Sequence, residues 1–210
     1  MLKDDDSKEK TEVMEIAAPK LLDGMKEHVI RTLEVIRGVD YAAVETLIRK
    51  LFSAYQERRH VFIFGNGGSG STASHFAEDL AKSPIRDRLK QKRRLRVLSL
   101  TDCTPFITAL GNDWGYDTVF REQLATNAEP GDLAIGFSGS GNSPNILSAI
   151  EWARENDLYT VGLTGFDGGK LRSMVHTSIH FPISDMEIAE NAHLIVMHMA
   201  VGGLRRLVNG

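Results

Sequence analysis

The feature that most constrains the fold is a regular alternation of short apolar runs with helical patterns. Five runs rich in β-branched, aromatic and aliphatic residues have the length of strands: residues 61–64, 95–100, 133–137, 159–164 and 176–182. Helical patterns lie between and after them, at 71–82, 117–128, 143–156, 169–174 and 186–208. Because continuous apolar strands are covered on both faces, the alternation predicts an α/β three-layer sandwich. Its core is a five-stranded parallel sheet flanked by helices, of the flavodoxin-like type.

Two long amphipathic helices are predicted before the first strand. Apolar residues recur at three- and four-residue intervals from 13 to 38 and from 41 to 58, whereas residues 1–12 are polar and expected to fray. No repeat or low-complexity linker divides the chain, so we expect a single domain over residues 1–210. Long helices that precede a sheet pack on it or on a second subunit, and we favour a homo-oligomer.

Composition excludes several classes of function. The 210 residues are 42% hydrophobic and 25% charged, with a net charge of −3, so no global basic excess indicates a nucleic-acid partner. No apolar stretch approaches the roughly 18–20 residues of a membrane span, and the first residues are charged, unlike a secretory signal. The single cysteine, Cys103, excludes an intramolecular disulfide and is expected to be a small buried hydrophobe. We expect a cytoplasmic protein.

Residues 82–96 form a strongly basic stretch, with eight basic residues and one acidic residue. A solvated loop that leads to the second strand is the simpler interpretation. Attraction of an anionic ligand or partner is the alternative.

A glycine-rich loop at residues 65–71 follows the first predicted strand and precedes a helix. Such a loop leaves backbone N–H groups at the positive end of a helix dipole, where a phosphate binds well. Neither a dinucleotide-binding G-x-G-x-x-G nor a lysine-containing P-loop is present. A tight turn without a ligand remains the alternative for this loop taken alone.

A second loop, Ser138–Ser143, repeats this arrangement after the strand at 133–137 and before a helix. Parallel strands end at the same edge of a sheet, and ligands bind outside that edge. The two loops, each with hydroxyls and free N–H groups, are therefore expected to hold one oxyanion ligand from two sides.

Four side chains on two predicted helices could carry chemistry. His75 and Asp79 are four residues apart and share a helix face. Glu190 and His198 are two turns apart, about 12 Å along the axis, and must lean together to meet. Two imidazoles and two carboxylates suit Zn²⁺ or another borderline divalent metal. A histidine among apolar helical neighbours, as His193 and His198 are, is more commonly a core or interface residue.

These residues resemble the sugar isomerase (SIS) domain family, and within it the phosphoheptose isomerase branch. The resemblance spans nearly the whole chain. Its motifs are the segments GNGGSxxxxxHFAE at 65–78, LGNDWGY at 110–116, SGSGNS at 138–143, LTGFDGGKL at 163–171 and the helix with Glu190 and His198.

The resemblance implies a zinc-dependent homotetramer that interconverts sedoheptulose 7-phosphate and D-glycero-D-manno-heptose 7-phosphate. Matching positions imply that substrate contacts come from Asn66, Gly67, Gly68, Ser69, Asn112 and Asp113. The phosphate would be held by Ser138, Gly139, Ser140 and Ser143. The metal ligands would be His75, Asp79, Glu190 and His198, of which Asp79 and Glu190 would also contact substrate and Asp79 and His198 would be the base and acid.

Two positions depart from the family pattern. Asp79 stands where the family usually has Glu, and its side chain is shorter by one C–C bond, about 1.5 Å, which matters for a proton transfer over roughly 2.6–3.2 Å. Glu190 replaces Gln and adds a negative charge that would hold a cation more strongly. The basic insertion before the second strand is also longer than usual.

Aldose–ketose isomerisation moves a proton between adjacent carbons through an enediol, for which a carboxylate base and an imidazole acid are suitable. Two alternatives remain: an isomerase of a different phosphosugar, and a non-catalytic SIS module that binds a phosphosugar or a protein partner. Retention of His75, a carboxylate at 79 and His198 favours an enzyme.

Overall fold

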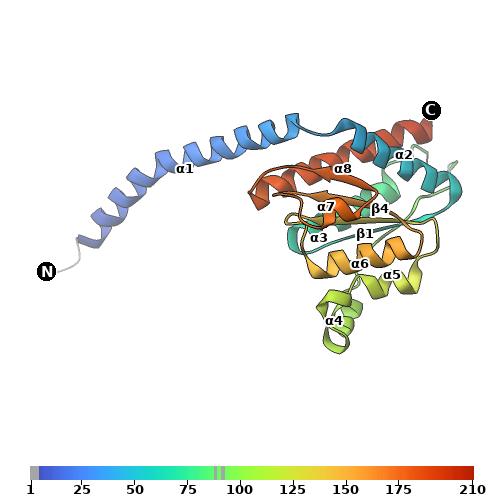
Figure 1. Cartoon of the computed structure of the whole chain (residues 1–210). Coiled ribbons are helices and arrows are strands. Elements are labelled where there is room, and N and C mark those ends of the chain that lie inside the picture. Colours follow the sequence, from blue (N-terminus) through green and yellow to red (C-terminus); the bar gives the residue numbers. More distant parts are fainter. Residues whose placement is uncertain (1–4, 88, 91–92) are drawn as a thin grey trace.

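The protein is an α/β sandwich in which a five-stranded parallel sheet lies between two layers of helices (Figure 1). The computed structural model describes residues 5–87, 89–90 and 93–210, with side chains from residue 20 onward. The strand order is β2-β1-β3-β4-β5, and each adjacent pair is parallel. The strands are β1 His60–Gly65, β2 Arg96–Ser99, β3 Leu133–Ser138, β4 Tyr159–Thr164 and β5 Thr177–His180. The predicted fold class is confirmed.

Alternate side chains of the central strands point into two separate cores, as the two-residue period of a strand requires. Val61 and Ile63 of β1 face the layer of α2 (Tyr41–Glu57), α3 (Gly67–Lys82) and α8 (Met186–Asn209). Phe62 and Phe64 face the other layer. That layer consists of α4 Thr104–Asp113, the short 3₁₀ helix Tyr116–Thr118, α5 Arg121–Asn127, α6 Pro144–Glu155 and α7 Leu171–Met174.

The edge strand β2 differs from the prediction that every strand is covered on both faces. Leu98 is 47% exposed, and the whole strand alternates between exposed and half-buried residues. An edge strand has a neighbour on one side only, and here helices cover only one of its faces. The prediction that residues 95–100 are buried on both faces is therefore wrong.

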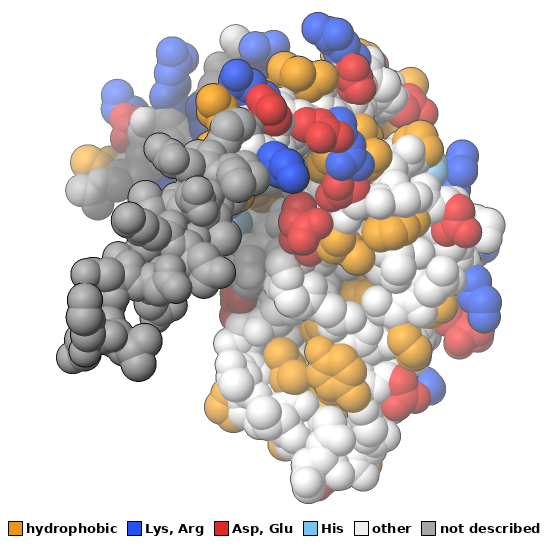
Figure 2. Space-filling view, turned by 90° about the vertical axis from the view of Figure 1, so that its left-hand side faces the viewer, with side chains coloured by type: hydrophobic (Ala, Val, Ile, Leu, Met, Phe, Trp, Pro, Cys, Tyr) orange, Lys and Arg blue, Asp and Glu red, His pale blue; other side chains and the backbone are white. Residues whose placement is uncertain are grey.

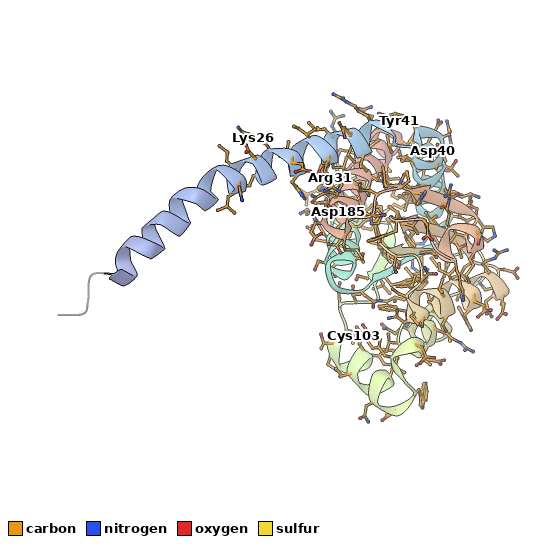
Figure 3. All side chains as sticks on the ribbon, turned by 60° about the vertical axis from the view of Figure 1, so that its left-hand side comes forward. Lys26, Arg31, Asp40, Tyr41, Cys103 and Asp185 are labelled. Atoms are coloured by element: carbon orange, nitrogen blue, oxygen red, sulfur yellow. The ribbon has the colours of Figure 1, made fainter. Side chains whose placement is uncertain are left out.

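Helix α1 (Asp5–Arg37) begins earlier than the expected residue 13. Residues 5–12 include Lys and Glu, which are good helix formers even without burial. The last turns of α1 are attached to α8: Arg31 Nη1 lies 2.9 Å from Asp185 Oδ2 (Figure 3). The bond from Ile188 N–H and then the Arg31 guanidinium lower the pKa of Asp185.

The preceding part of α1 extends away from the body of the molecule (Figure 1). It carries a stripe of exposed apolar side chains: Leu21, Leu22, Met25, Val29, Ile30 and Leu33. Figure 2 shows further hydrophobic side chains exposed on the face from which α1 projects. None of the helices in the described part of the chain is long and apolar enough to cross a membrane.

Helix α4 was not predicted, and it protrudes from the edge of the molecule (Figure 1). Leu110 is its one buried side chain, and Phe106 and Ile107 are partly buried against the same core. Cys103, just before α4, is exposed (Figure 3), and the prediction of a buried cysteine is wrong.

The basic stretch at 82–96 is anchored to the end of α2. Arg93 Nη1 donates to Gln56 O and Arg96 Nη1 to Arg58 O, both at 3.2 Å. Residues 88, 91 and 92 of this stretch lie outside the described residues.

Candidate active site

The two glycine loops meet where the strand order reverses. Because β1 pairs with β2 on one side and β3 on the other, the carboxyl ends of β1 and β3 form the topological switch point, where α/β sheets bind ligands. Gly65 at the end of β1 is paired with Phe137 of β3. The segments that follow therefore begin side by side, as predicted from the sequence. The first segment is shorter than the predicted loop 65–71, because α3 already begins at Gly67 and its first turns contain the remaining glycines.

A pair of amides joins the loops. Asn66 Nδ2 donates to Asn145 Oδ1 at 2.9 Å, and Asn145 Nδ2 donates back to Asn66 Oδ1 at 2.8 Å. Asn66 Oδ1 also accepts a hydrogen bond from the Tyr116 hydroxyl at 3.1 Å. Asn145, in the first turn of α6, is only 2% exposed. This pair fixes the distance between the loops.

Asn145→Ala is expected to lower the free energy of unfolding by about 1–3 kcal/mol, because the half-buried amide of Asn66 loses both hydrogen bonds to its partner. It should also raise KM for a phosphosugar more than it lowers kcat, since the loops lose their mutual support. Urea unfolding and steady-state kinetics measure both effects. The matched control, Tyr116→Phe, removes an exposed bond to the same Asn66 oxygen and should cost less. Equal effects of the two variants would contradict the role of Asn145.

The second loop is closed by close backbone contact. Gly141 has a φ of +66°, and a Cβ there would overlap the carbonyl of Gly168, so only glycine fits. Gly141 N donates to Ser138 Oγ at 3.1 Å, and Ser138 Oγ lies 3.4 Å from Ser143 Oγ. Two of the predicted phosphate-binding hydroxyls thus face each other across the loop.

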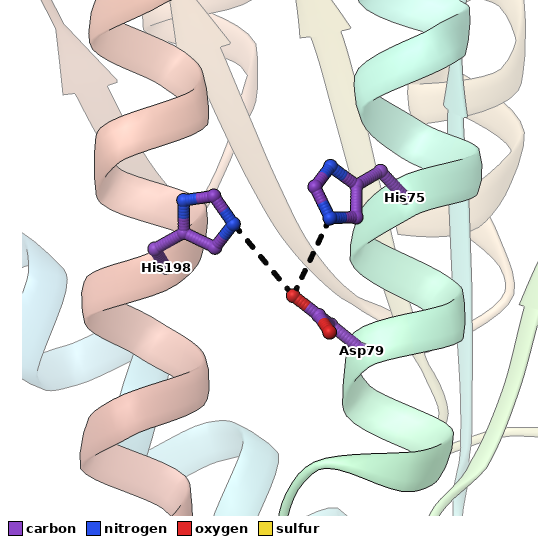
Figure 4. Close-up of side chains that lie close together, drawn as sticks. All are labelled: His75, Asp79 and His198. Carbon is purple, nitrogen blue, oxygen red and sulfur yellow. Dashed lines mark ion pairs between the residues drawn. The ribbon is translucent and has the colours of Figure 1, made fainter.

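Figure 4 shows His75 and Asp79 of α3 together with His198 of α8. Asp79 Oδ2 lies 3.6 Å from His75 Nε2 and 3.7 Å from His198 Nε2, and the three ligand atoms lie within 4.8 Å of one another. These distances are too long for hydrogen bonds. They approach the separation of about 3.3 Å between two ligands of a tetrahedral zinc with bonds near 2.0–2.1 Å. The three side chains therefore fit a metal, with a fourth position left for a substrate or Glu190.

Glu190, the fourth expected ligand, lies outside this group. Its carboxylate rests against the first glycine loop, where a Cβ at Gly68 would overlap it. Glu190 and His198 are both on α8, so one helix reaches the glycine loop with one residue and the His–Asp–His group with the other. The site therefore extends along the line between α3 and α8.

His193 belongs to the core rather than to the site. It is 1% exposed and lies between Phe137 and Phe181, with ring centroids 5.9 and 6.2 Å away. Neither ring nitrogen has a side-chain or backbone partner of hydrogen-bonding geometry within the described part of the chain. Burial lowers the pKa of His193 to about 4.

This lowered pKa predicts a loss of stability in acid. Unfolded His193 takes up a proton near pH 6.5, whereas the folded residue does so only near pH 4, so stability falls progressively between these values. Over about 2.5 pH units the loss is roughly 3 kcal/mol. Urea unfolding at pH 7, 5.5 and 4.5 measures this loss. Between pH 7 and pH 4.5 the free energy of unfolding of His193→Leu should fall less than that of the wild type. Identical pH profiles would contradict the assignment.

Asn112 and Asp113 lie at the exposed end of α4. Asn112 Nδ2 donates to Asp113 Oδ1 at 2.7 Å, and neither side chain bonds to the glycine loops among the described residues. Tyr116, a few residues further on, does reach the first loop.

Three polar contacts of the site were missed from the sequence. Asn145 and Tyr116 bond to Asn66, and Ser74, next to His75, bonds to Asp102 Oδ1 at 2.5 Å. The segment LGNDWGY included Tyr116, but nothing in the sequence pairs Asn145 with Asn66 or Ser74 with Asp102.

Comparisons with known proteins show the family and the fold of the chain. Residues 26–165 match the SIS domain family. The phosphoheptose isomerase of Pelobacter propionicus is 38% identical over 151 residues, which cover 71% of this chain and 77% of that protein. That of Citrifermentans bemidjiense is 33% identical over 176 residues, covering 83% and 88%. A solved phosphoheptose isomerase from Francisella tularensis shares the fold with a TM-score of 0.81 at 24% identity, covering 90% and 98%.

These relatives, together with the fold, place the protein among the aldose–ketose isomerases. The chain belongs to the SIS-domain family, in its phosphoheptose isomerase branch.

Proposed function

We propose that the protein interconverts sedoheptulose 7-phosphate and D-glycero-D-manno-heptose 7-phosphate. The observation that carries the proposal is the convergence of three side chains: His75 and Asp79 lie on α3, whose first turn is rich in glycine, and His198 reaches them from α8. The relatives named phosphoheptose isomerase support the substrate.

The proposed roles follow from the chemistry of the side chains. Asp79 removes the proton from the carbon beside the carbonyl and returns it to the neighbouring carbon, which had been the carbonyl carbon. His198 donates a proton to the carbonyl oxygen and takes one from the neighbouring hydroxyl oxygen. The enediol therefore forms and then collapses to the isomeric sugar without net loss or gain of protons. The loop Ser138–Ser143 holds the phosphate with the hydroxyls of Ser138, Ser140 and Ser143 and the backbone of Gly139. This remote binding holds the reacting carbons in register.

Contacts to the rest of the sugar are proposed for Asn66 and for the first turn of α3, with Gly67, Gly68 and Ser69. Asn112 and Asp113 would join them through movement of the protruding α4 or from another subunit. Glu190 is proposed to contact the substrate from its place against Gly68.

A zinc ion fits the side chains of His75, Asp79 and His198, and Glu190 would complete the set by turning toward them. The metal would polarise the substrate carbonyl as a Lewis acid. The support is the donor set and its spacing.

A homotetramer is part of the proposal. The apolar stripe of α1 is exposed and extends away from the body of its own subunit (Figure 1), so a second chain would be needed to cover it. A groove of about 730 Å³ beside His198, lined by Val44, Ile48, Ile195 and Met199, suits an apolar helix of a second copy. Light scattering should then give four times the 23.2 kDa mass of the chain. We place the enzyme in the cytoplasm, because one cysteine and no disulfide are compatible with a reducing compartment.

The test is turnover of sedoheptulose 7-phosphate by the purified protein, loaded with zinc. We expect an aldose 7-phosphate product, and about one zinc per chain by metal analysis. A faster reaction with a different phosphosugar would reassign the substrate. Binding of a phosphosugar with no turnover and no metal would instead indicate a non-catalytic module.

A further inference from the structure

A second polar pocket lies at the opposite edge of the sheet from the candidate active site. It has a volume of about 420 Å³ and is bordered by the first residues of two strands, Leu133 of β3 and Tyr159 of β4. Ser138 ends the same strand β3 at the active-site edge, so the two sites are about 16 Å apart along the strand.

Cationic groups enter this pocket from three elements. They are Lys50 of α2, Arg59 of the turn that precedes β1, and Arg154 of the last turn of α6. Two carboxylates also line it. Glu57 accepts a bond from Ser53 Oγ at 2.6 Å and lies 3.9 Å from Arg59 Nε, so it is already neutralised, and Asp157 is exposed. Asp157 is then the one carboxylate of the pocket that faces the two positive charges of Lys50 and Arg154.

Lys50 and Arg154 both have N–H groups that bond to no other residue among those described. Lys50 Nζ lies 4.1 Å from the centre of the Tyr159 ring and pairs with no carboxylate among the described residues. Arg154 donates from Nη1 to Met174 O, and its other N–H groups have no partner of hydrogen-bonding geometry in the described part of the chain.

His176 supplies a neutral donor to the same pocket. Its Nδ1 accepts a hydrogen bond from Thr160 N at 3.1 Å, which places the proton of the neutral ring on Nε2. The ring stacks on Tyr159 with centroids 4.9 Å apart. Burial and then the positive charges of Arg154 and Lys50 lower the pKa of His176.

We propose that this pocket is a second anion-binding site, which takes inorganic phosphate or a small phosphomonoester between Lys50, Arg154 and His176. An oxyanion accepts bonds from an ammonium, a guanidinium and an imidazole N–H, and it relieves the mutual repulsion of the two cations. The site is separate from the serine loop and does not depend on the isomerase activity.

Equilibrium dialysis with radiolabelled inorganic phosphate at low ionic strength tests the proposal. Two phosphates are expected per wild-type chain, one at the serine loop and one in this pocket. Lys50→Gln should weaken the second site by about tenfold and leave turnover within twofold, because Lys50 is outside the active site and has no structural hydrogen bond. Lys50→Arg should restore binding. Arg49→Gln is the matched control, since it removes the neighbouring cation of α2, which pairs with Glu45 outside the pocket.

One phosphate per wild-type chain, located at the serine loop, would overturn the proposal, as would equal losses in Lys50→Gln and Arg49→Gln. Absence of turnover with the second phosphate retained would refute the isomerase assignment and leave this site standing.

Discussion

Replacing His198 with asparagine is expected to lower kcat by about 10²–10⁴-fold, the usual contribution of a general acid–base group. Asparagine has a similar polar head but cannot shuttle a proton between the two substrate oxygens. His198 Nε2 is aimed at Asp79 from a separate helix, so its loss removes one side of the site without opening the core. The measurement is steady-state turnover of sedoheptulose 7-phosphate, with far-UV circular dichroism to confirm folding.

The matched control is His60→Asn. His60 lies at the amino end of β1, at the opposite edge of the sheet, and its ring is near Asp132 rather than the site. Its kcat should stay within about twofold. A His198→Asn enzyme with normal kcat would remove that imidazole from the mechanism.

Replacing Asp79 with asparagine is expected to abolish both metal retention and turnover. Asp79 Oδ2 is the atom common to the two histidine contacts, so its charge holds the group together. An amide is a poor ligand for zinc beside two imidazoles, and it cannot act as a base. We expect metal affinity to fall by at least the roughly 10–100-fold seen when a partner outside the ligand shell is lost, and kcat by about 10²–10⁴-fold.

Zinc content after dialysis against a weak chelator, together with turnover, measures the two effects. Glu78→Gln is the control, because Glu78 is the adjacent carboxylate on α3 but is bonded to Lys82 at the surface. Asp79→Glu, which keeps a carboxylate at this position, should keep the metal. Full zinc content in Asp79→Asn would show that the metal is held elsewhere.

The fold was predictable because its strands are apolar runs of fixed length. The runs at 61–64, 133–137 and 159–164 coincide with β1, β3 and β4, which are buried between helices on both sides. Helix α4 was not predictable in the same way. It is only 10 residues long, with Leu110 buried and Phe106 and Ile107 partly buried, and so short a segment shows too little of the helical period to be recognised.

The glycine loops and the pair His75 and Asp79 were predicted because loop chemistry and helical spacing are local. The placement of α8 was not local. On this one helix, Glu190 lies against Gly68, His193 lies in the core and His198 lies beside Asp79. These positions depend on how α8 packs on α3 and the sheet, which the local sequence does not show. The hydrogen bonds between Asn66 and Asn145 join residues that are 79 positions apart in the sequence. They are neighbours because β1 and β3 are adjacent in the sheet.

The most direct test of the account is a crystal structure of the zinc-treated protein, soaked briefly with sedoheptulose 7-phosphate. We predict that the phosphate lies within hydrogen-bonding distance of Ser138 and Ser143, with the first two carbons beside Asp79 and His198. A sugar whose phosphate lies away from the serine loop, or whose carbonyl end lies away from these two side chains, would contradict it.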